Sequence, residues 1–187
     1  MSNQFTKIAA GCAIAIVSFA GAANSQTGSA APASTVVANP TYISIPMEIM
    51  VNRPAAEVWK RVGKFCDIGE WLQIPCTIVT GKDGEFGAIR SVAGEVLVGK
   101  TELSYTYTQT VKEGRPYNLY HGTLEARPVT ATTSKLVYTL IFDNSILPDD
   151  AAREKDRAQR NARFMQALEN MKTLAEGGTL PPPPARK

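Results

Sequence analysis

A single histidine, His121, limits the catalytic chemistry that this 187-residue chain could carry. A serine–histidine–acid triad and a zinc site of cysteine and histidine ligands would both depend on it. His121 and Glu125 fall on the polar side of an alternating segment, 117–127, so both are expected to face solvent. The paired carboxylates of Asp149 and Asp150 are explained by the start of a helix. The sequence therefore gives no complete catalytic group, metal site or glycine-rich phosphate loop, and we expect no cofactor.

Aromatic side chains on the predicted strands carry a stronger signal of function. Tyr105 and Tyr107 share one face of a strand, and Tyr120 shares a face with Leu124, because side chains alternate along a strand. These residues could form pocket walls with hydroxyl ends, or they could be core aromatics whose hydroxyl groups need partners. Arg90 could hold a carboxylate or phenolate in its fork of donors, or it could be a surface arginine opposite an acid.

Two further aromatic residues have alternative roles. Trp71 follows the first predicted helices, where it could lie at the entrance of a cavity or, as we slightly favour, plug the end of the core. Tyr138 belongs to a segment that is apolar on both faces, so alternation does not assign it to the inner or the outer face.

The N-terminal residues follow the order of a secretory signal. The apolar run 8–23 is shorter than the roughly 20 residues of a spanning helix, so we expect cleavage to remove residues 1–25, with an uncleaved anchor as the alternative. Residues 26–40 are typical of a flexible lead-in, and residues 177–187 of a disordered proline-rich tail. Residues 41–176 between them are expected to form one folded domain. The mature chain would be periplasmic or secreted, without stable membrane insertion.

Charge and cysteine content narrow the possible partners and the compartment. The formal charge of +3, from 20 basic and 17 acidic residues, gives no reason to expect nucleic acid as a partner. In an oxidising compartment, the two cysteines left after cleavage, Cys66 and Cys76, suggest one disulfide, with two buried thiols as the alternative. The oligomeric state is left open, because no exposed apolar stripe stands out.

A series of strands and one long helix would position these residues. Strands are predicted at 42–51, 77–80, 86–93, 95–98, 103–110, 117–127 and 134–143, with tight turns that are typical of an antiparallel meander. A short helix begins at Pro54, and a long amphipathic helix runs from about residue 148 to Glu176. A sheet that curls around one helix leaves a space between them, which predicts an apolar pocket. Its floor would be the helix stripe that includes Phe164, Met165, Leu168 and Met171.

Several short motifs resemble a known family. The segment 54–59, PAAEVW, resembles the PA-x-x-VW opening of the polyketide cyclase/dehydrase and lipid-transport family, within the START-like (Bet v 1-like, SRPBCC) superfamily. The segment 65–71 is similar to its F-x-x-I-x-x-W motif, and 87–90 to its G-x-x-R motif. The resemblance implies an α+β helix-grip fold, in which a curved antiparallel sheet of about six to seven strands wraps around a long C-terminal helix. It also implies a cavity for small aromatic or lipidic molecules.

We therefore expect an exported binding protein for a small hydrophobic or aromatic ligand. The first alternative is an enzyme of cyclase, aldolase or lyase type that acts on an aromatic or polyketide-like substrate in the same cavity, with a tyrosine and Arg90 as acid and anion anchor. The second is a structural or partner-binding envelope protein. The expected ligand-binding residues are Trp71, Arg90, Tyr105, Tyr107, Tyr120, Leu124, Tyr138, Phe164, Met165, Leu168 and Met171.

Overall fold

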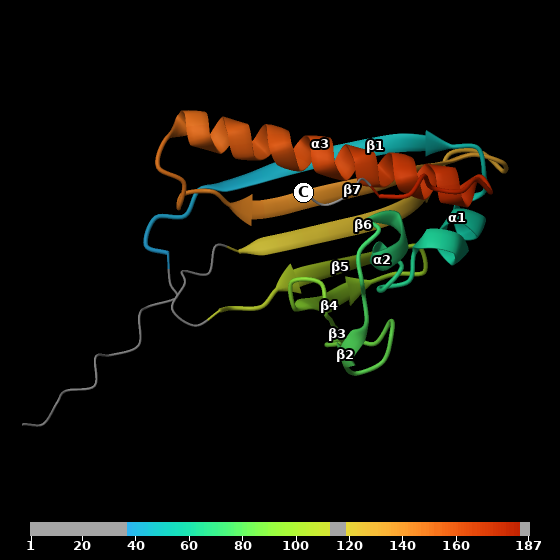
Figure 1. The fold of residues 1–187 in the computed structure, drawn as a ribbon, viewed down its shortest axis with the longest axis horizontal. Coiled ribbons are helices and arrows are strands. Elements are labelled where there is room, and N and C mark those ends of the chain that lie inside the picture. The colour runs from blue at the N-terminus through green and yellow to red at the C-terminus, as the bar shows by residue number, and fades with distance from the viewer. Residues whose placement is uncertain (1–36, 113–118, 184–187) are drawn as a thin grey trace, which may run out of the picture. The chain divides into compact units, whose positions relative to one another are not determined.

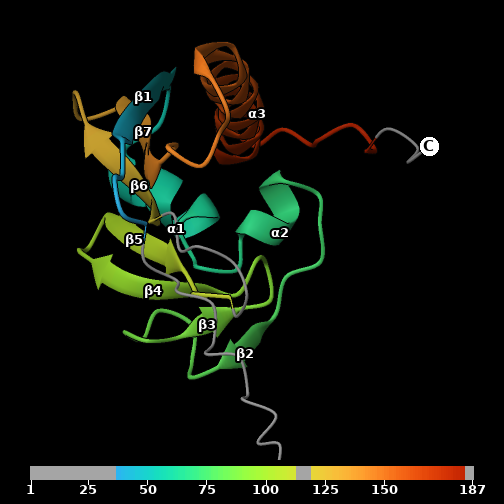
Figure 2. The same cartoon turned by 90° about the vertical axis from the view of Figure 1, so that its left-hand side faces the viewer.

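The computed structural model of the protein describes residues 37–112 and 119–183. Seven strands form one antiparallel sheet in the order β1-β7-β6-β5-β4-β3-β2, and three helices lie on one of its faces (Figures 1 and 2). The strands are β1 (Tyr42–Val51), β2 (Ile78–Thr80), β3 (Ile89–Arg90), β4 (Glu95–Lys100), β5 (Ser104–Gln109), β6 (Tyr120–Pro128) and β7 (Ser134–Asp143). The helices are α1 (Ala55–Val62), α2 (Ile68–Trp71) and α3 (Asp150–Ala175).

This arrangement confirms the predicted α+β helix-grip fold. The helix α3 packs chiefly on β1 and also touches β7, α1 and α2 (Figure 2). Its N-cap is Asp149, whose Oδ1 accepts a hydrogen bond of 2.7 Å from the backbone N–H of Ala152. It ends beside Gly177, whose φ of 91° suits a glycine after a helix. None of the helices in the described residues has an apolar stretch long enough to cross a membrane.

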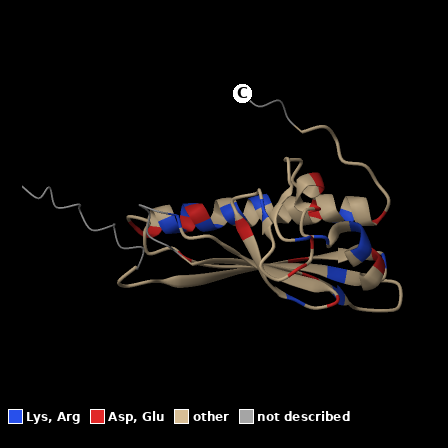
Figure 3. Cartoon of the chain, turned by 90° about the horizontal axis from the view of Figure 1, so that it is seen from below, with Lys and Arg blue, Asp and Glu red and all other residues tan. Residues whose placement is uncertain are grey.

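The buried stripe of α3 differs from the predicted one. The buried residues are Phe164, Ala167, Leu168, Met171 and Leu174. Met165 of the predicted stripe is half-buried, and Ala158 and Ala162, which continue that stripe toward the start of the helix at spacings of three and four, are exposed. Large apolar side chains bury more area than alanine, so they decide which face of the helix turns inward. Acidic and basic residues are interspersed along α3 (Figure 3), and Glu154 and Lys155 are among those that are exposed.

The expected strand at 86–93 is much shorter in the structure. Only Ile89–Arg90 form β3, because glycines in the left-handed region stand on both sides, Gly87 with a φ of 80° and Gly94 with 66°. Phe86, at the start of the expected strand, is 64% exposed. The sheet therefore narrows at this end, where β2 and β3 are the shortest strands.

The two chain ends fall largely outside the regular elements. The predicted signal, residues 1–25, lies outside the described residues, as does most of the lead-in 26–40. Of the tail, residues 177–183 are described and contain no helix or strand. Leu180 is half-buried against the hydrophobic core, and the carbonyl of Pro181 accepts a 2.6 Å hydrogen bond from Nε2 of Gln73.

Candidate functional site

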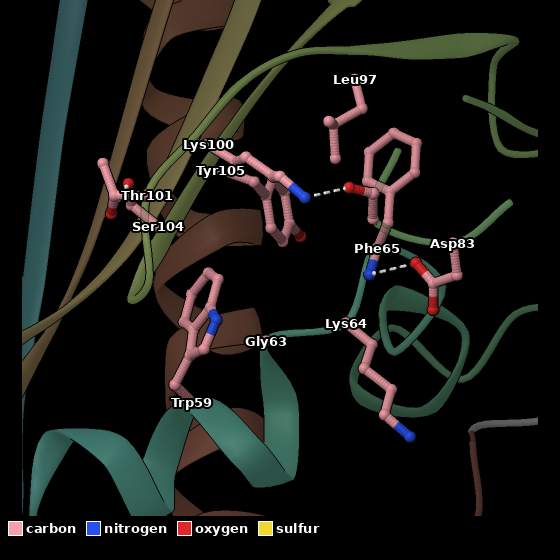
Figure 4. Close-up of a pocket in the computed structure, with 11 residues that line it drawn as sticks. Trp59, Gly63, Lys64, Phe65, Asp83, Leu97, Lys100, Thr101, Ser104 and Tyr105 are labelled. Carbon is pink, nitrogen blue, oxygen red and sulfur yellow. Dashed lines mark hydrogen bonds between the residues drawn. The ribbon is translucent and has the colours of Figure 1, made fainter. Parts of the chain in front are cut away.

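A pocket of about 330 Å³ lies beside the C-terminal end of α1, between the β4–β5 turn and the loop that joins β2 to β3 (Figure 4). Its volume is at the lower end of the range for small-molecule sites. Its lining residues are Trp59, Gly63, Lys64, Phe65, Asp83, Gly84, Leu97, Lys100, Thr101, Ser104 and Tyr105. Three segments that are distant in sequence therefore meet at this site.

Aromatic rings form much of the pocket wall. The ring of Tyr105 lies 5.7 Å from that of Trp59 and 5.5 Å from that of Phe65, between ring centroids. Both pairs are within the range of favourable aromatic contacts. Gly63 makes room for the indole, since a Cβ at this position would lie only 2.3 Å from a ring carbon of Trp59. Gly63, one helical turn after Trp59, has no side chain, so the indole of Trp59 can lie over it and line the pocket.

Polar groups lie at the rim of the pocket. Nζ of Lys100 donates a 2.5 Å hydrogen bond to the carbonyl oxygen of Gly84, across the pocket from β4 (Figure 4). The hydroxyl groups of Thr101 and Ser104 are 2.8 Å apart and hydrogen-bonded. Oδ1 of Asp83 accepts a 3.0 Å hydrogen bond from the backbone N–H of Phe65. The site therefore combines an apolar interior with one ammonium group, one carboxylate and two hydroxyls at its edge.

Arg90 lies in the core behind this wall and is fully buried. Its Nε donates a 2.7 Å hydrogen bond to Oε2 of Glu95, and its Nη1 donates to the carbonyl oxygen of Phe65. Its guanidinium carbon also lies 4.3 Å from the ring centroid of Phe65 and 4.7 Å from that of Tyr107. Arg90 is thus paired with an acid, as one prediction had it, but in the core and not on the surface.

The electrostatics of this pair follow from its burial. Burial alone would lower the pKa of Arg90, but Tyr105 and Glu95 hold it above its ordinary value. Burial raises the pKa of Glu95, although Arg90 acts in the opposite direction. Nη2 of Arg90 lies 2.5 Å from Oε2 of the same carboxylate. Because its Nη1 donates to the carbonyl oxygen of Phe65, Arg90 holds the backbone at one wall of the pocket.

Four tyrosines project from the sheet into the same core. The hydroxyl groups of Tyr107 and Tyr138 are 2.8 Å apart and hydrogen-bonded, which assigns Tyr138 to the inner face. Burial raises the pKa of Tyr105 and Tyr120 and raises that of Tyr107 and Tyr138 well above the ordinary value. All four therefore stay protonated near neutral pH. The buried hydroxyl of Tyr105 makes no well-aligned hydrogen bond among the described residues, although it interacts with the guanidinium of Arg90.

The other predicted ligand-binding residues pack against one another in the core. Trp71 is fully buried, and its ring lies 6.4 Å from that of Tyr138, which agrees with the view that it plugs the core. The ring of Phe164 lies 4.8 Å from that of Tyr138. The hydrophobic core also contains Tyr120, Leu124, Leu168 and Met171, with Met165 half-buried beside it. Whether these residues contact a ligand stays a prediction.

Of the predicted binding residues, only Tyr105 lines the pocket at α1. Sequence reasoning missed Trp59, Phe65 and Lys100. Trp59 and Phe65 stand in the two motifs that carried the family resemblance, and this is the signal that could have found them. Lys100 had no such signal, because its place at the pocket depends on how the β4–β5 turn meets Gly84.

The described residues hold no group of three or more histidine, cysteine, aspartate or glutamate side chains placed to bind a metal ion. The predicted disulfide between Cys66 and Cys76 is present, with Cα atoms 5.6 Å apart. It joins the residue after Phe65 to the segment before β2. The disulfide therefore restrains the loop from which Phe65 enters the pocket.

An antiparallel sheet that grips a C-terminal helix defines the helix-grip class of α+β proteins. Residues 42–176 match the family model described as polyketide cyclase/dehydrase and lipid transport. The chain belongs to this family, as the motifs predicted. A search of the curated proteins gave no match.

Three solved structures illustrate the shared fold. A protein of Thermobifida fusca, solved by NMR, is 23% identical with a TM-score of 0.59 and covers 73% of this chain and 97% of its own. The Zhui aromatase/cyclase of a Streptomyces species is 17% identical with a TM-score of 0.55, covering 74% and 100%. A truncated norcoclaurine synthase of Thalictrum flavum is 10% identical with a TM-score of 0.53, covering 75% and 98%. At these identities, the likeness concerns the fold.

Proposed function

We propose that the protein is an exported binding protein for a small hydrophobic or aromatic molecule, which it holds in the pocket beside Trp59. One observation carries the proposal: three aromatic rings, from Trp59, Phe65 and Tyr105, line a pocket of about 330 Å³. Flat apolar molecules gain most from such walls, because ring stacking adds to the burial of apolar area. Leu97 adds an aliphatic surface to the same pocket.

Export rests on the N-terminal sequence and on the cysteines. The signal-like order of residues 1–25 and the disulfide between Cys66 and Cys76 both suit an oxidising compartment. Expression in a bacterial host tests this part of the proposal. Mass spectrometry should find the mature protein outside the cytoplasm without the signal and two mass units lighter than its reduced form. A full-length protein in the cytoplasm would contradict export.

Binding can be tested with N-phenyl-naphthylamine, a neutral dye that fluoresces in apolar surroundings. We expect a dissociation constant of about 1 μM, or about −8 kcal/mol. Because the Ser104 side chain lines the pocket, Ser104→Trp should fill it and abolish binding. Val98→Trp is the matched control, since Val98 is 45% exposed on the neighbouring strand and does not line the pocket. Dye binding by a folded Ser104→Trp protein at the parent's affinity would refute this site.

A second candidate is an enzyme that acts on an aromatic or polyketide-like substrate. The observation in its favour is the buried hydroxyl of Tyr105, a pocket residue that interacts with Arg90 but makes no well-aligned hydrogen bond among the described residues. Two proteins of the same fold, the aromatase/cyclase and the norcoclaurine synthase, are named as enzymes. Turnover of a polyketide-like substrate that is lost in Tyr105→Phe, while dye binding persists, would favour the enzyme. Equal turnover in both proteins would exclude a role for this hydroxyl.

A further inference from the structure

We infer that the ligand is an aromatic anion, whose ring system lies against the rings of Trp59 and Tyr105 and whose acidic group binds the ammonium group of Lys100. This inference rests on the proposed function, because it concerns the ligand of the same pocket. It adds a charge and an orientation to what the aromatic walls alone would accept.

The ammonium group of Lys100 lies at the pocket with donors to spare. Its one hydrogen bond among the described residues goes to the carbonyl oxygen of Gly84, and an ammonium group has three N–H donors. No carboxylate of the described residues lies within ion-pair distance of it, in contrast to Arg61, Arg90 and Lys135. The ammonium group also lies 5.7 Å from the ring centroid of Phe86, an exposed and weak cation–π contact that uses none of its N–H donors in a hydrogen bond. Two donors and the positive charge can therefore still meet a ligand.

The other charges near the pocket favour an anion as well. Lys64 also lines the pocket and belongs to the same rim, although its side chain points away from the other lining residues (Figure 4). Asp83 is the one carboxylate of the lining, and its Oδ1 already accepts the N–H of Phe65. Arg90, behind the wall, is neutralised by Glu95 at 2.5 Å. Lys100 thus supplies an ammonium group at the pocket, and Lys64 adds a more distant positive charge, against one partly engaged carboxylate.

Neighbouring hydroxyl groups complete a site for an acidic group. Thr101 and Ser104 follow Lys100 around the β4–β5 turn, and their hydroxyls, bonded to each other, retain a donor and acceptor sites for a ligand. The rings of Trp59 and Phe65 form other parts of the wall, on either side of the Tyr105 ring (Figure 4). A flat molecule with a carboxylate or sulfonate at one end would place its rings against these walls and its charge at Lys100.

A pair of dyes that differ by one acidic group tests the inference. N-phenyl-naphthylamine is neutral, and anilinonaphthalene sulfonate carries the same rings with a sulfonate. We expect the sulfonate to bind about fivefold more tightly, since an exposed charge-assisted contact contributes about 1 kcal/mol. The preference should vanish near 1 M salt, where charges are screened beyond about 3 Å.

Substitutions of single lysines then show which ammonium group causes the preference for the sulfonate. Lys100→Met should weaken the sulfonate about fivefold and leave the neutral dye unchanged, and Lys100→Arg should restore the preference, because it keeps the charge. The matched control is Lys82→Met, which removes a lysine next to Asp83 that does not line the pocket. Lys82→Met should leave the ratio of the two dissociation constants within about twofold of the ratio in the parent protein. Thermal unfolding must show that each variant is folded.

Each outcome supports or overturns a distinct statement. If neither dye binds, the proposed function fails and the inference fails with it. If the neutral dye binds but the sulfonate binds no more tightly, the binding function stands and the anion inference is overturned. A tighter fit for an aromatic ammonium compound, or a sulfonate preference that survives Lys100→Met, would overturn it as well.

Discussion

Gly122 of β6 allows the ring of Tyr107 to lie across the strand, and Gly122→Ala tests this packing. The two residues are opposite each other in the β5–β6 pairing. A Cβ at Gly122 would lie 2.4 Å from both the Oη and the Cζ of Tyr107, closer than any real contact. The Tyr107 ring would have to move, and its hydroxyl would separate from that of Tyr138, which is 2.8 Å away.

The expected cost follows from these contacts. Two buried hydroxyls without partners cost about 1–3 kcal/mol, and forced repacking of a core costs about 1–3 kcal/mol. Alanine within a strand is more stabilising than glycine by about 0.5–1 kcal/mol, which offsets part of this cost. We therefore expect Gly122→Ala to lower the free energy of unfolding by about 3 kcal/mol, measured by urea titration with the disulfide intact.

A matched control and a double mutant make the test specific. Gly99→Ala, in β4, places its Cβ 3.4 Å from the Cβ of Thr106, an ordinary contact, and should change stability by less than about 1 kcal/mol. In a Tyr107→Leu background the clash is gone, so Gly122→Ala should cost less than about 1 kcal/mol there. An unchanged urea midpoint for Gly122→Ala in the native background would refute the reasoning.

Three further results are expected. Replacing Cys66 and Cys76 by serine should lower the free energy of unfolding by about 3 kcal/mol, the entropy of closing a short loop, and equal urea midpoints for the two proteins would contradict this. Burial lowers the pKa of His121, so its NMR signal should titrate below pH 6.5; the stability it contributes is present above pH 6.5 and is lost as pH falls through the folded pKa. Tyr138→Phe should cost about 1–2 kcal/mol in urea titration because it leaves the hydroxyl of Tyr107 without this partner, whereas Tyr105→Phe should cost less, since that hydroxyl makes no well-aligned hydrogen bond among the described residues; equal losses would contradict the assignment.

The sequence predicted the elements best where one short-range rule applied. Alternation along β6 placed Tyr120 and Leu124 inside, and both are buried, with His121 half-buried on the other face. Proline within a strand is typical of sheet edges, and β1, which contains Pro46, is an edge strand. The expected strand at 86–93 failed because positive φ angles at Gly87 and Gly94 end it on both sides, and the sequence does not show which glycines adopt them.

The candidate site was harder to predict because it depends on tertiary contacts. The wall residues Trp59 and Tyr105 are 46 positions apart in the sequence, and their meeting depends on Gly63 and on the turn of α1 toward β5. Arg90 looked like a candidate anchor because its type suits anions, but its partner Glu95 lies across the tight turn from β3 to β4. Spacing alone did not reveal that pairing.

The two edges of the sheet have a consequence for how copies of the chain meet. At one edge, β1 carries Pro46, which has no N–H to offer a strand of another molecule. At the other edge, β2 has three residues, and its register is broken between Ile78 and Thr80. Short, irregular or proline-containing edges give poor templates for the growth of a sheet. The folded protein should therefore resist edge-to-edge aggregation even at high concentration.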